Sequence, residues 1–312
     1  MPNAADALMK TDLPLANRRQ GKVRDIYDMS LADGSDALLI VATDRISAFD
    51  VVMANGVPGK GAVLTQISKF WFNRFASVMP HHLLSTDPAD IPGLTAEQRA
   101  PLKGRIMICR KTKVVPIECV VRGYLTGSGY KDYLKTGAVC GIELPQGMVN
   151  SSKIEQPIFT PSTKAETGHD ENISFAEACD IVGEKTMNTL RDNTLKIYTE
   201  GREYAAGKGI IIADTKFEFG VPVDAPDSAP ILIDEVLTPD SSRFWLADDY
   251  EAGREQNSLD KQFVRNYLEG LVKSGQWDKT PPGPALPDDV IENTLAKYLD
   301  AYRRLTGNDL AL

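Results

Sequence analysis

The segment from Ile210 to Gly220, Ile-Ile-Ile-Ala-Asp-Thr-Lys-Phe-Glu-Phe-Gly, constrains the fold of this chain more than any other. Its first half is an unbroken apolar run, which is typical of a strand buried on both faces. Its second half alternates, so that Asp214, Lys216 and Glu218 share one face of the strand and the phenylalanines share the other. Because charged side chains are costly to bury, this face indicates a functional site.

A second apolar strand, Ile231-Leu232-Ile233, follows this segment and ends in Asp234-Glu235. Mg²⁺ in proteins binds one or two carboxylates together with phosphate oxygens. Neighbouring strands that end in carboxylates beside a lysine therefore suit a metal-bound polyphosphate. The alternative is a solvated strand end with a salt bridge, and the flanking apolar runs weigh against it because they indicate burial.

The composition is that of a globular protein, and the length of 312 residues suits two domains. The formal net charge is −8. The acidic balance argues against general binding to nucleic acid or to anionic membranes. The longest apolar run, Ala37 to Ala42, is too short to cross a bilayer. The first ten residues lack the pattern of a signal peptide, and four scattered cysteines fit a reducing compartment. We therefore expect a cytoplasmic protein.

The first third of the chain reads mainly as strands. The segments Gly21–Asp28 and Ala37–Thr43 flank a turn-rich stretch, which predicts an antiparallel hairpin. An apolar stripe predicts a helix from Leu64 to Met79. The pattern changes near Pro116, so we predict a strand-rich lobe over residues 1–115 and a mixed α/β lobe over residues 116–312.

Helices are predicted mainly in the second lobe. Ser174 and Glu177 form a capping box that opens one helical stretch running to about Tyr204. Two amphipathic helices are predicted near residues 258–274 and 288–305.

Glycine-rich segments offer candidate phosphate sites. The segment Gly21–Tyr27 begins with glycine, which lets a backbone approach phosphate closely, and then places Lys22 and Arg24 on one face. An exposed edge strand with basic side chains is the alternative, and both remain open. The segment Gly56–Gly61 lacks the spacing of a phosphate loop and is predicted to be a turn before the helix.

Three further segments place cations beside small or polar residues. In Glu118–Gly129, an apolar strand leads to Arg122, whose planar fork suits phosphate or carboxylate, and then to Ser128. Ser241-Ser242-Arg243 is a second hydroxyl-plus-arginine site, and the loop from Thr160 to Glu171 carries Lys164 among acids and hydroxyls. The alternatives are a solvated arginine and an ordinary surface loop.

Taken together, these segments resemble the SAICAR synthetase family, the phosphoribosylaminoimidazole-succinocarboxamide synthases. The resemblance runs in the family's order to about residue 268. The chain is longer than the compact members and resembles the longer, fungal-type form. This length favours a monomer, with a homodimer as the alternative. The matching segments are Gly21–Tyr27, Asp44–Asp50, Val115–Gly129, Lys164–Asn172, Asp214–Gly220 and Asp234–Trp245.

The resemblance implies an α+β fold with two lobes, kinase-like or ATP-grasp-like, and an ATP cleft between the lobes. It implies a ligase of purine biosynthesis that joins the carboxylate of a carboxyaminoimidazole ribonucleotide (CAIR) to the amine of L-aspartate. The products are SAICAR, ADP and phosphate. The implied cofactors are ATP and Mg²⁺, and the implied partners are small molecules, with neither nucleic acid nor membrane among them.

The resemblance also implies roles for individual residues. Lys216 and Asp234 are the implied catalytic residues, with Asp234 as the Mg²⁺ ligand. The backbone of Glu118–Val120 is expected beside adenine, at a hinge between the lobes. The implied ATP-binding residues are Gly21, Lys22, Val23, Arg24, Glu118, Val120, Lys164 and Glu218. The implied substrate-binding residues are Arg122, Ser128 and Arg243, which hold the ribonucleotide phosphate, together with Asp170, Asp44 and Ser47.

Two other functions fit parts of this pattern. A small-molecule kinase also needs a glycine hairpin, a hinge and a metal-binding aspartate, although we find no H-R-D catalytic loop followed by asparagine. A non-catalytic nucleotide-binding module needs no second anion site at Arg122, Ser128 and Arg243.

Overall fold

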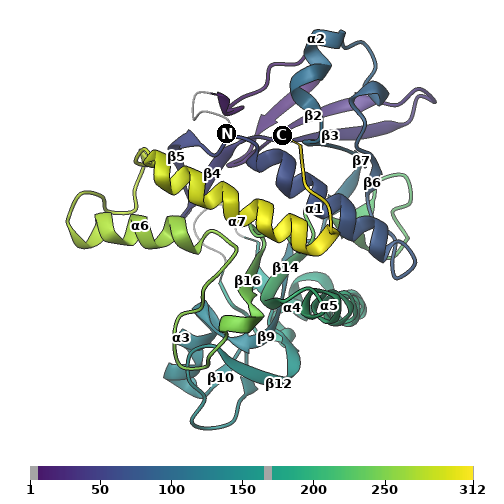
Figure 1. Cartoon of the computed structure of the whole chain (residues 1–312). Coiled ribbons are helices and arrows are strands. Elements are labelled where there is room, and N and C mark those ends of the chain that lie inside the picture. The colour runs from purple at the N-terminus through teal and green to yellow at the C-terminus, as the bar shows by residue number, and fades with distance from the viewer. Residues whose placement is uncertain (1–5, 165–170, 312) are drawn as a thin grey trace. The chain divides into compact units, whose positions relative to one another are not determined.

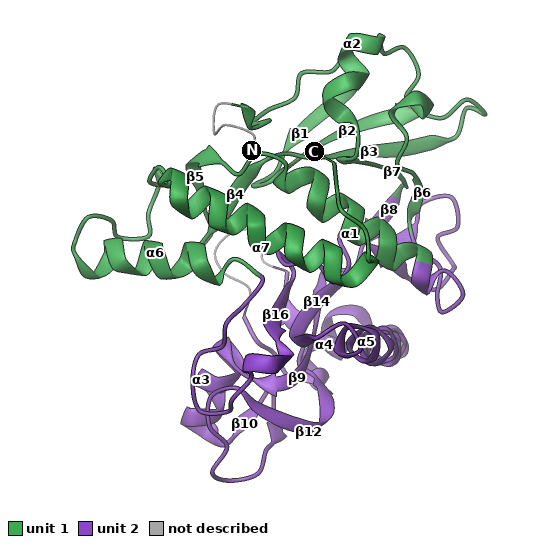
Figure 2. Cartoon of the chain, viewed as in Figure 1, with its two compact units in different colours: residues 1–73, 82–111, 260–312 green, residues 74–81, 112–259 purple. Residues whose placement is uncertain are grey.

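The computed structural model describes residues 6–164 and 171–311 (Figure 1). The chain folds into two compact units (Figure 2). Unit 1 comprises residues 1–73, 82–111 and 260–312, and unit 2 comprises residues 74–81 and 112–259. Both units combine antiparallel sheets with helices, so the predicted α+β class is confirmed. Of the described helices, none has the length and apolar character needed to span a bilayer.

Unit 1 is built on a five-stranded antiparallel sheet in the order β1-β2-β3-β7-β6, beside a two-stranded ribbon of β4 and β5. The predicted hairpin is confirmed as β2 and β3, which pair from Arg24 opposite Ala42 to Ser30 opposite Asp36. The strands are β1 (Ala16–Gln20), β2 (Arg24–Ser30), β3 (Asp36–Ala42), β4 (Arg45–Ala48), β5 (Val51–Gly56), β6 (Leu83–Ser85) and β7 (Ile106–Arg110).

The core of unit 1 forms on one face of this sheet because alternate residues of a strand point the same way. Tyr27, Leu39, Val41, Ile106 and Ile108 belong to one buried cluster. The helices of unit 1 are α1 (Lys60–Phe75, whose last two residues group with unit 2), α2 (Ala96–Arg99), α6 (Gln262–Lys273) and α7 (Asp288–Thr306), with short 3-10 turns η2 (Pro88–Asp90) and η3 (Ala100–Leu102).

Two unit 1 features differ from the sequence-based expectation. α1 begins at Lys60, four residues before the predicted start, because the turn closes with the Lys60 amide donating to the Val57 carbonyl and runs directly into the helix. Residues 260–312 group with unit 1, whereas the predicted limits of 1–115 and 116–312 place them in the second lobe. The Asn55 side chain of β5 bonds both the amide and the carbonyl of Leu286, which ties this segment to unit 1.

Unit 2 is built around the long strand β14, in a sheet of order β12-β9-β14-β15. The first half of β14 pairs with β9 and β16, and its second half pairs with β8 and β15. The strands are β8 (Thr112–Val114), β9 (Ile117–Leu125), β10 (Ala138–Val139), β11 (Ile142–Glu143), β12 (Ser152–Phe159), β13 (Ser162–Thr163), β14 (Ile210–Pro222), β15 (Ile231–Ile233) and β16 (Ser242–Leu246).

The helices of unit 2 are α3 (Gly127–Thr136), α4 (Phe175–Val182), α5 (Glu184–Ala206) and the 3-10 turn η4 (Ala247–Asp249). α5 packs on β9, β12 and β14. The predicted capping box is confirmed, since the Glu177 amide donates to Ser174 Oγ and the Ser174 amide donates to Glu177 Oε2. The predicted helical stretch to about Tyr204 consists of two helices, because Gly183 has a φ of +85° and separates α4 from α5.

Candidate active site

A charged face on two paired strands is the main feature of unit 2. In the antiparallel register of β9 and β14, Asp214 lies opposite Arg122 and Lys216 lies opposite Val120. Opposite residues share a face of the sheet, and so do alternate residues of one strand. The other face carries Cys119 and Phe217, which are fully buried, and the Cys119 thiol lies near Thr194 of α5. The charged face therefore carries Glu118, Val120, Arg122, Asp214, Lys216 and Glu218.

Two lysines and two glutamates form a cluster at one end of this face. Lys164 Nζ lies 2.7 Å from Glu118 Oε1 and 2.7 Å from Glu218 Oε1. Lys216 Nζ lies 3.1 Å from Glu118 Oε2, at ion-pair distance but without hydrogen-bond alignment. Burial lowers the pKa of Lys164, but the charges of Glu218 and Glu118 outweigh it and raise that pKa overall. Lys164 is therefore a fixed positive charge beside the buried Glu118.

Two arginines share one carboxylate at the other end of the face. Arg122 Nη1 lies 3.2 Å from Asp214 Oδ2, and Arg243 Nη1 contacts the same oxygen. Arg122 also donates to Thr160 Oγ1 through Nε and to Ser128 Oγ through Nη2. Burial lowers the pKa of Arg122, and Asp214 opposes that change. Two guanidinium groups against one carboxylate leave an excess of positive charge, which suits an anion.

The first turn of α3 lies against these arginines. Gly127, its first residue, has a φ of +59°, and a Cβ atom there would overlap the guanidinium of Arg243. Glycine has no side chain and adopts positive φ without strain, so at this position the backbone can approach the arginine closely. The N-terminus of a helix carries partial positive charge. The structure thus brings the predicted residues Arg122, Ser128 and Arg243 together at the start of a helix.

In unit 1, the loop at residues 21–24 is held from its inner side. Arg45, which is 4% exposed, donates to the carbonyls of Gly21, Lys22 and Arg24. The carbonyl of Val23 accepts from the amide and the hydroxyl of Thr43. All four carbonyls of the loop are therefore bound inward. Carbonyl oxygens would repel a phosphate, so this arrangement leaves the outer side of the loop suited to an anion.

The side chains of this loop are accessible. Lys22 Nζ lies 2.5 Å from Asp50 Oδ1, and the Lys22 side chain is 55% exposed. Val23 and Arg24 are half-buried, and Arg24 begins β2.

Asp44 has a structural position inside unit 1. Its Oδ1 accepts from the Gly61 amide at 3.0 Å and from Arg105 Nη1 at 2.8 Å, while Oδ2 accepts from the Leu8 amide at 2.8 Å. A buried carboxylate with these donors is already satisfied within unit 1. Ser47 lies on β4 with a half-buried side chain.

The backbone of Glu118–Val120 does not form an open hinge. β9 pairs with β14 on one side and with β12 and β13 on the other, so this segment is interior to the sheet of unit 2. The Val120 carbonyl accepts from the Thr160 amide at 2.8 Å. This carbonyl is therefore bonded within the sheet, and the side chain of Glu118 is a further candidate group for the nucleotide.

Asp234 follows β15 directly, with a left-handed φ of +64° and a half-buried side chain. Its neighbour Ile233 lies opposite Glu218 in the register of β14 and β15. Among the described residues, no group of three or more His, Cys, Asp or Glu side chains forms a metal-binding cluster. The predicted site residue Asp170 lies outside the described residues.

Three residues of these networks were not predicted as site residues. Arg45 lies in the Asp44–Asp50 motif, but a sequence does not show that its side chain turns inward to the 21–24 loop. Thr160 lies in a loop with several hydroxyl side chains, and the sequence does not show which of them contacts Arg122. The alternation in β14 predicts Asp214 on the charged face, and only the strand register identifies it as the shared partner of two arginines.

Comparison with known proteins gives a consistent result. The model of the family "SAICAR synthetase" matches residues 17–282. The phosphoribosylaminoimidazole-succinocarboxamide synthase of Geobacter sulfurreducens is 53% identical over 97% of this chain and 99% of its own length. The synthase of the same name from Syntrophotalea carbinolica is 54% identical over 96% of this chain and 98% of its own.

Solved structures agree with these sequence relatives. The SAICAR synthase of Saccharomyces cerevisiae, solved in complex with SAICAR, has a TM-score of 0.84 and 42% identity, covering 98% of this chain and 100% of its own. The synthase of Ehrlichia chaffeensis has a TM-score of 0.65 at 19% identity, covering 94% of this chain and 99% of its own, and shows the same fold. The likeness to full-length bacterial relatives indicates that this longer form is not confined to fungi.

Proposed function

The chain belongs to the SAICAR synthetase family, and on this premise we propose which of its residues bind and activate each reactant. It is an ATP-dependent ligase of purine biosynthesis that joins the carboxylate of CAIR to the amine of L-aspartate. The relatives give no support to the small-molecule kinase alternative, since each of those reported is named as a SAICAR synthase or phosphoribosylaminoimidazole-succinocarboxamide synthase.

The reaction proceeds through an acyl phosphate. A carboxylate is a poor electrophile because its charge repels a nucleophile and oxide is a poor leaving group. An oxygen of the CAIR carboxylate attacks the γ-phosphorus of ATP, and ADP leaves. The neutral amine of aspartate then attacks the acyl carbon. The C–O bond to the phosphoryl group breaks, inorganic phosphate leaves with its electron pair, and the nitrogen loses a proton to give the amide. Phosphoryl transfer asks a protein mainly for positioning and for neutralisation of charge.

The residues of unit 2 divide between two of the reactants, the ribonucleotide and ATP. The ribonucleotide phosphate binds where Arg122, Arg243 and Ser128 meet the start of α3, and this convergence is the observation that carries the proposal. The cluster of Lys164, Lys216, Glu118 and Glu218 serves the nucleotide and the reacting carboxylate. Lys164 and Lys216 neutralise developing charge, and the two glutamates hold their ammonium groups in place.

The residues of unit 1 serve the ATP phosphates. With the carbonyls of Gly21 to Arg24 bound inward, the loop presents its outer side, and Lys22 contributes the ammonium group.

Asp234 is the residue that would hold Mg²⁺. The donor set fits this ion, because Mg²⁺ keeps several waters and binds one or two carboxylates plus phosphate oxygens rather than a dedicated protein cage. The metal would supply positive charge to the triphosphate. The protein's own part is to place Asp234 directly after β15.

The metal assignment is tested with Asp234→Asn and, as a control, Asp227→Asn on an exposed loop of the same unit. ADP release should depend on both CAIR and aspartate in the parent enzyme. We expect Asp234→Asn to lower turnover by about 10²-fold or more, because metal-borne charge stabilisation is lost. The control should retain turnover, and near-normal turnover of Asp234→Asn would remove this residue from the metal site.

The anion site is tested with Arg243→Ala. Charge-assisted hydrogen bonds to phosphate are strong, so the KM for CAIR should rise by about tenfold or more while the KM for ATP changes little. An unchanged KM for CAIR would contradict the assignment. A stable phosphorylated product formed without aspartate would overturn the ligase mechanism itself.

We also propose that the enzyme works as a monomer in the cytoplasm. The length of the chain and its likeness to the longer form support the monomer, and four free cysteines support a reducing compartment. Light scattering during gel filtration measures the mass, and a dimeric mass at micromolar concentration would contradict the monomer. Cell fractionation tests the compartment.

A further inference from the structure

A two-residue turn in unit 1 has a left-handed backbone conformation that residues other than glycine and asparagine rarely adopt. Phe49 and Asp50 connect β4 to β5, and the flanking residues Ala48 and Val51 pair directly. Their φ angles are +52° and +63°, so both residues are left-handed, as in a type I′ hairpin turn. Such turns usually contain Asn-Gly, because other residues, and bulky ones above all, adopt positive φ at a cost. Contacts of the side chains must therefore hold this turn.

The ring of Phe49 is held by the connection between α6 and α7, residues 274–287. The Trp277 ring lies with its centroid 6.2 Å from that of Phe49, at an angle of 55°. Lys279 Nζ lies 4.2 Å from the Phe49 centroid, over the ring, and also 2.6 Å from Glu269 Oε1. Aromatic and cation–π contacts of this kind are attractive. The α6–α7 connection thus fixes the first residue of the turn.

The second residue of the turn holds the lysine of the 21–24 loop. Asp50 Oδ1 lies 2.5 Å from Lys22 Nζ, and the two side chains are 47% and 55% exposed. An ion pair this exposed contributes little to folding. Its effect lies in the position of the ammonium group, because a free lysine side chain explores many rotamers. An ammonium group has three donors, so Lys22 can keep Asp50 and still donate to a second oxygen.

We propose that Asp50 is a positioning residue for the ATP-binding Lys22, and that Phe49, Trp277 and Lys279 hold Asp50 in place. The inference rests on the proposed role of Lys22 in binding the ATP phosphates. It gives the α6–α7 connection a part in nucleotide binding although it lies more than 200 residues along the chain from the loop it serves. The backbone of Lys22 is anchored by Arg45 and its ammonium group by Asp50, so both ends of the residue are fixed before ATP arrives.

The test compares Asp50→Ala, Asp50→Asn and Trp277→Ala in the full-length enzyme, with Trp277→Phe as the conservative variant. Losing the fixed position should raise the KM for ATP by about threefold to tenfold in Asp50→Ala and Trp277→Ala, since a mobile lysine side chain must then be ordered on binding. The KM for aspartate and kcat should change little. Asp50→Asn keeps a hydrogen-bond acceptor, so its KM for ATP should lie between those of Asp50→Ala and the parent. Trp277→Phe keeps an aromatic ring, so its KM for ATP should stay close to that of the parent.

The control is Asp36→Ala, which removes another exposed carboxylate of unit 1, paired with Lys111 at 3.6 Å. It should leave the KM for ATP unchanged. A fall in the KM for ATP in both Asp50 variants would overturn the inference, because it would mean that Asp50 repels the phosphates. An unchanged KM in folded Asp50→Ala and Trp277→Ala, checked by circular dichroism, would also overturn it.

Lys22→Ala separates this inference from the function on which it rests. If Lys22→Ala leaves the KM for ATP unchanged, the proposed role of Lys22 itself fails. If Lys22→Ala raises that KM but Asp50→Ala does not, only the positioning role fails. With both correct, the double variant Lys22→Ala/Asp50→Ala should be no worse than Lys22→Ala alone, because the two substitutions remove one function.

Discussion

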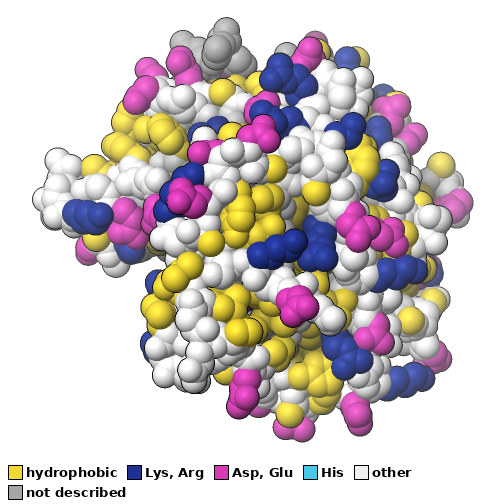
Figure 3. Space-filling model, turned by 60° about the horizontal axis from the view of Figure 1, so that its bottom comes forward, with side chains coloured by type: hydrophobic (Ala, Val, Ile, Leu, Met, Phe, Trp, Pro, Cys, Tyr) yellow, Lys and Arg dark blue, Asp and Glu magenta, His cyan; other side chains and the backbone are white. Residues whose placement is uncertain are grey.

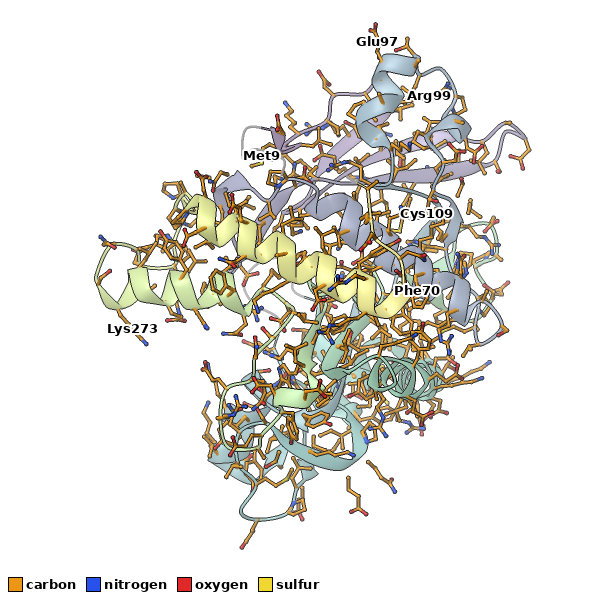
Figure 4. All side chains as sticks on the ribbon, viewed as in Figure 1. Met9, Phe70, Glu97, Arg99, Cys109 and Lys273 are labelled. Carbon is orange, nitrogen blue, oxygen red and sulfur yellow. The ribbon has the colours of Figure 1, made fainter. Side chains whose placement is uncertain are left out.

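At the scale of single residues, buried ion pairs organise the loops from which the proposed ligand contacts come. Asp25 is fully buried in unit 1, where its oxygens accept from the amide and hydroxyl of Thr11 and from Arg45 Nη2 at 2.9 Å. Arg45 in turn bonds the 21–24 loop and the carbonyl of Met9, a residue labelled in Figure 4. The sequence shows these residues as charged positions in strands. It does not show that they are one network.

The Asp25 network predicts a loss of stability in acid. Burial raises the pKa of Asp25, but the bonds from Thr11 and Arg45 outweigh it, so its pKa is lowered overall. Its stabilising contribution is therefore present above the unfolded pKa, about 3.9, and is lost as the pH falls through the lower folded pKa. We expect Asp25→Asn to lower the free energy of unfolding by about 3 kcal/mol at pH 7, because Arg45 loses its buried counter-charge.

Urea unfolding between pH 3 and pH 7 measures this effect. The gap between the parent protein and Asp25→Asn should narrow towards the acid end, because protonation of Asp25 removes the same charge as the substitution. A gap of constant size across this range would contradict the assigned role.

At the scale of elements, strand register and close backbone contacts decide what the sequence pattern leaves open. The alternation in β14 predicted its charged face, yet only the register with β9 sets Arg122 opposite Asp214. Strands that are consecutive in the sequence can also belong to different sheets. The consecutive strands β7 and β8 do not pair with each other. β7 pairs with β3 and β6 in unit 1, whereas β8 and β9 pair with β14 in unit 2.

Two glycines in helices should respond oppositely to alanine. Gly61 in the first turn of α1 lies against the carbonyls of Ala42 and Thr43, and a Cβ atom there would overlap them. We expect Gly61→Ala to lower the free energy of unfolding by about 1–3 kcal/mol, because backbone atoms must move. Gly270 in α6 has open space around it, so Gly270→Ala should raise that free energy by about 0.5–1 kcal/mol through helix propensity. Denaturant titration checks both, and equal effects would contradict this packing.

At the scale of the whole molecule, the chain builds one unit from three separate segments. Residues 260–312 return to unit 1 after unit 2 is complete, and α6, which ends at the Lys273 labelled in Figure 4, belongs to this return. On the face shown in Figure 3, basic and acidic side chains are interspersed. Anionic reactants are therefore expected to depend on local clusters of lysine and arginine, since the net charge of −8 would repel them.

Removing residues 275–312 should loosen unit 1 more than unit 2. The truncation deletes the partners of Asn55 and the Pro284 carbonyl that accepts from the Ala54 amide. Amide hydrogen exchange should therefore accelerate in β4 and β5, while β9 and β14 of unit 2 keep more of their protection. Equal acceleration in both units, or none in β5, would contradict the grouping of this segment with unit 1.

The sequence by itself determined the α+β class, the charged face of β14, the capping box and the family, because each follows from local periodicity or from ordered motifs. It also identified Arg122, Ser128 and Arg243, which the fold brings together. Only the tertiary structure decided that the 21–24 loop turns its carbonyls onto Arg45, that Asp44 is satisfied internally, and that the C-terminal segment joins unit 1. These features depend on contacts between residues far apart in the chain, and side-chain direction across such distances leaves no periodic signal in the sequence.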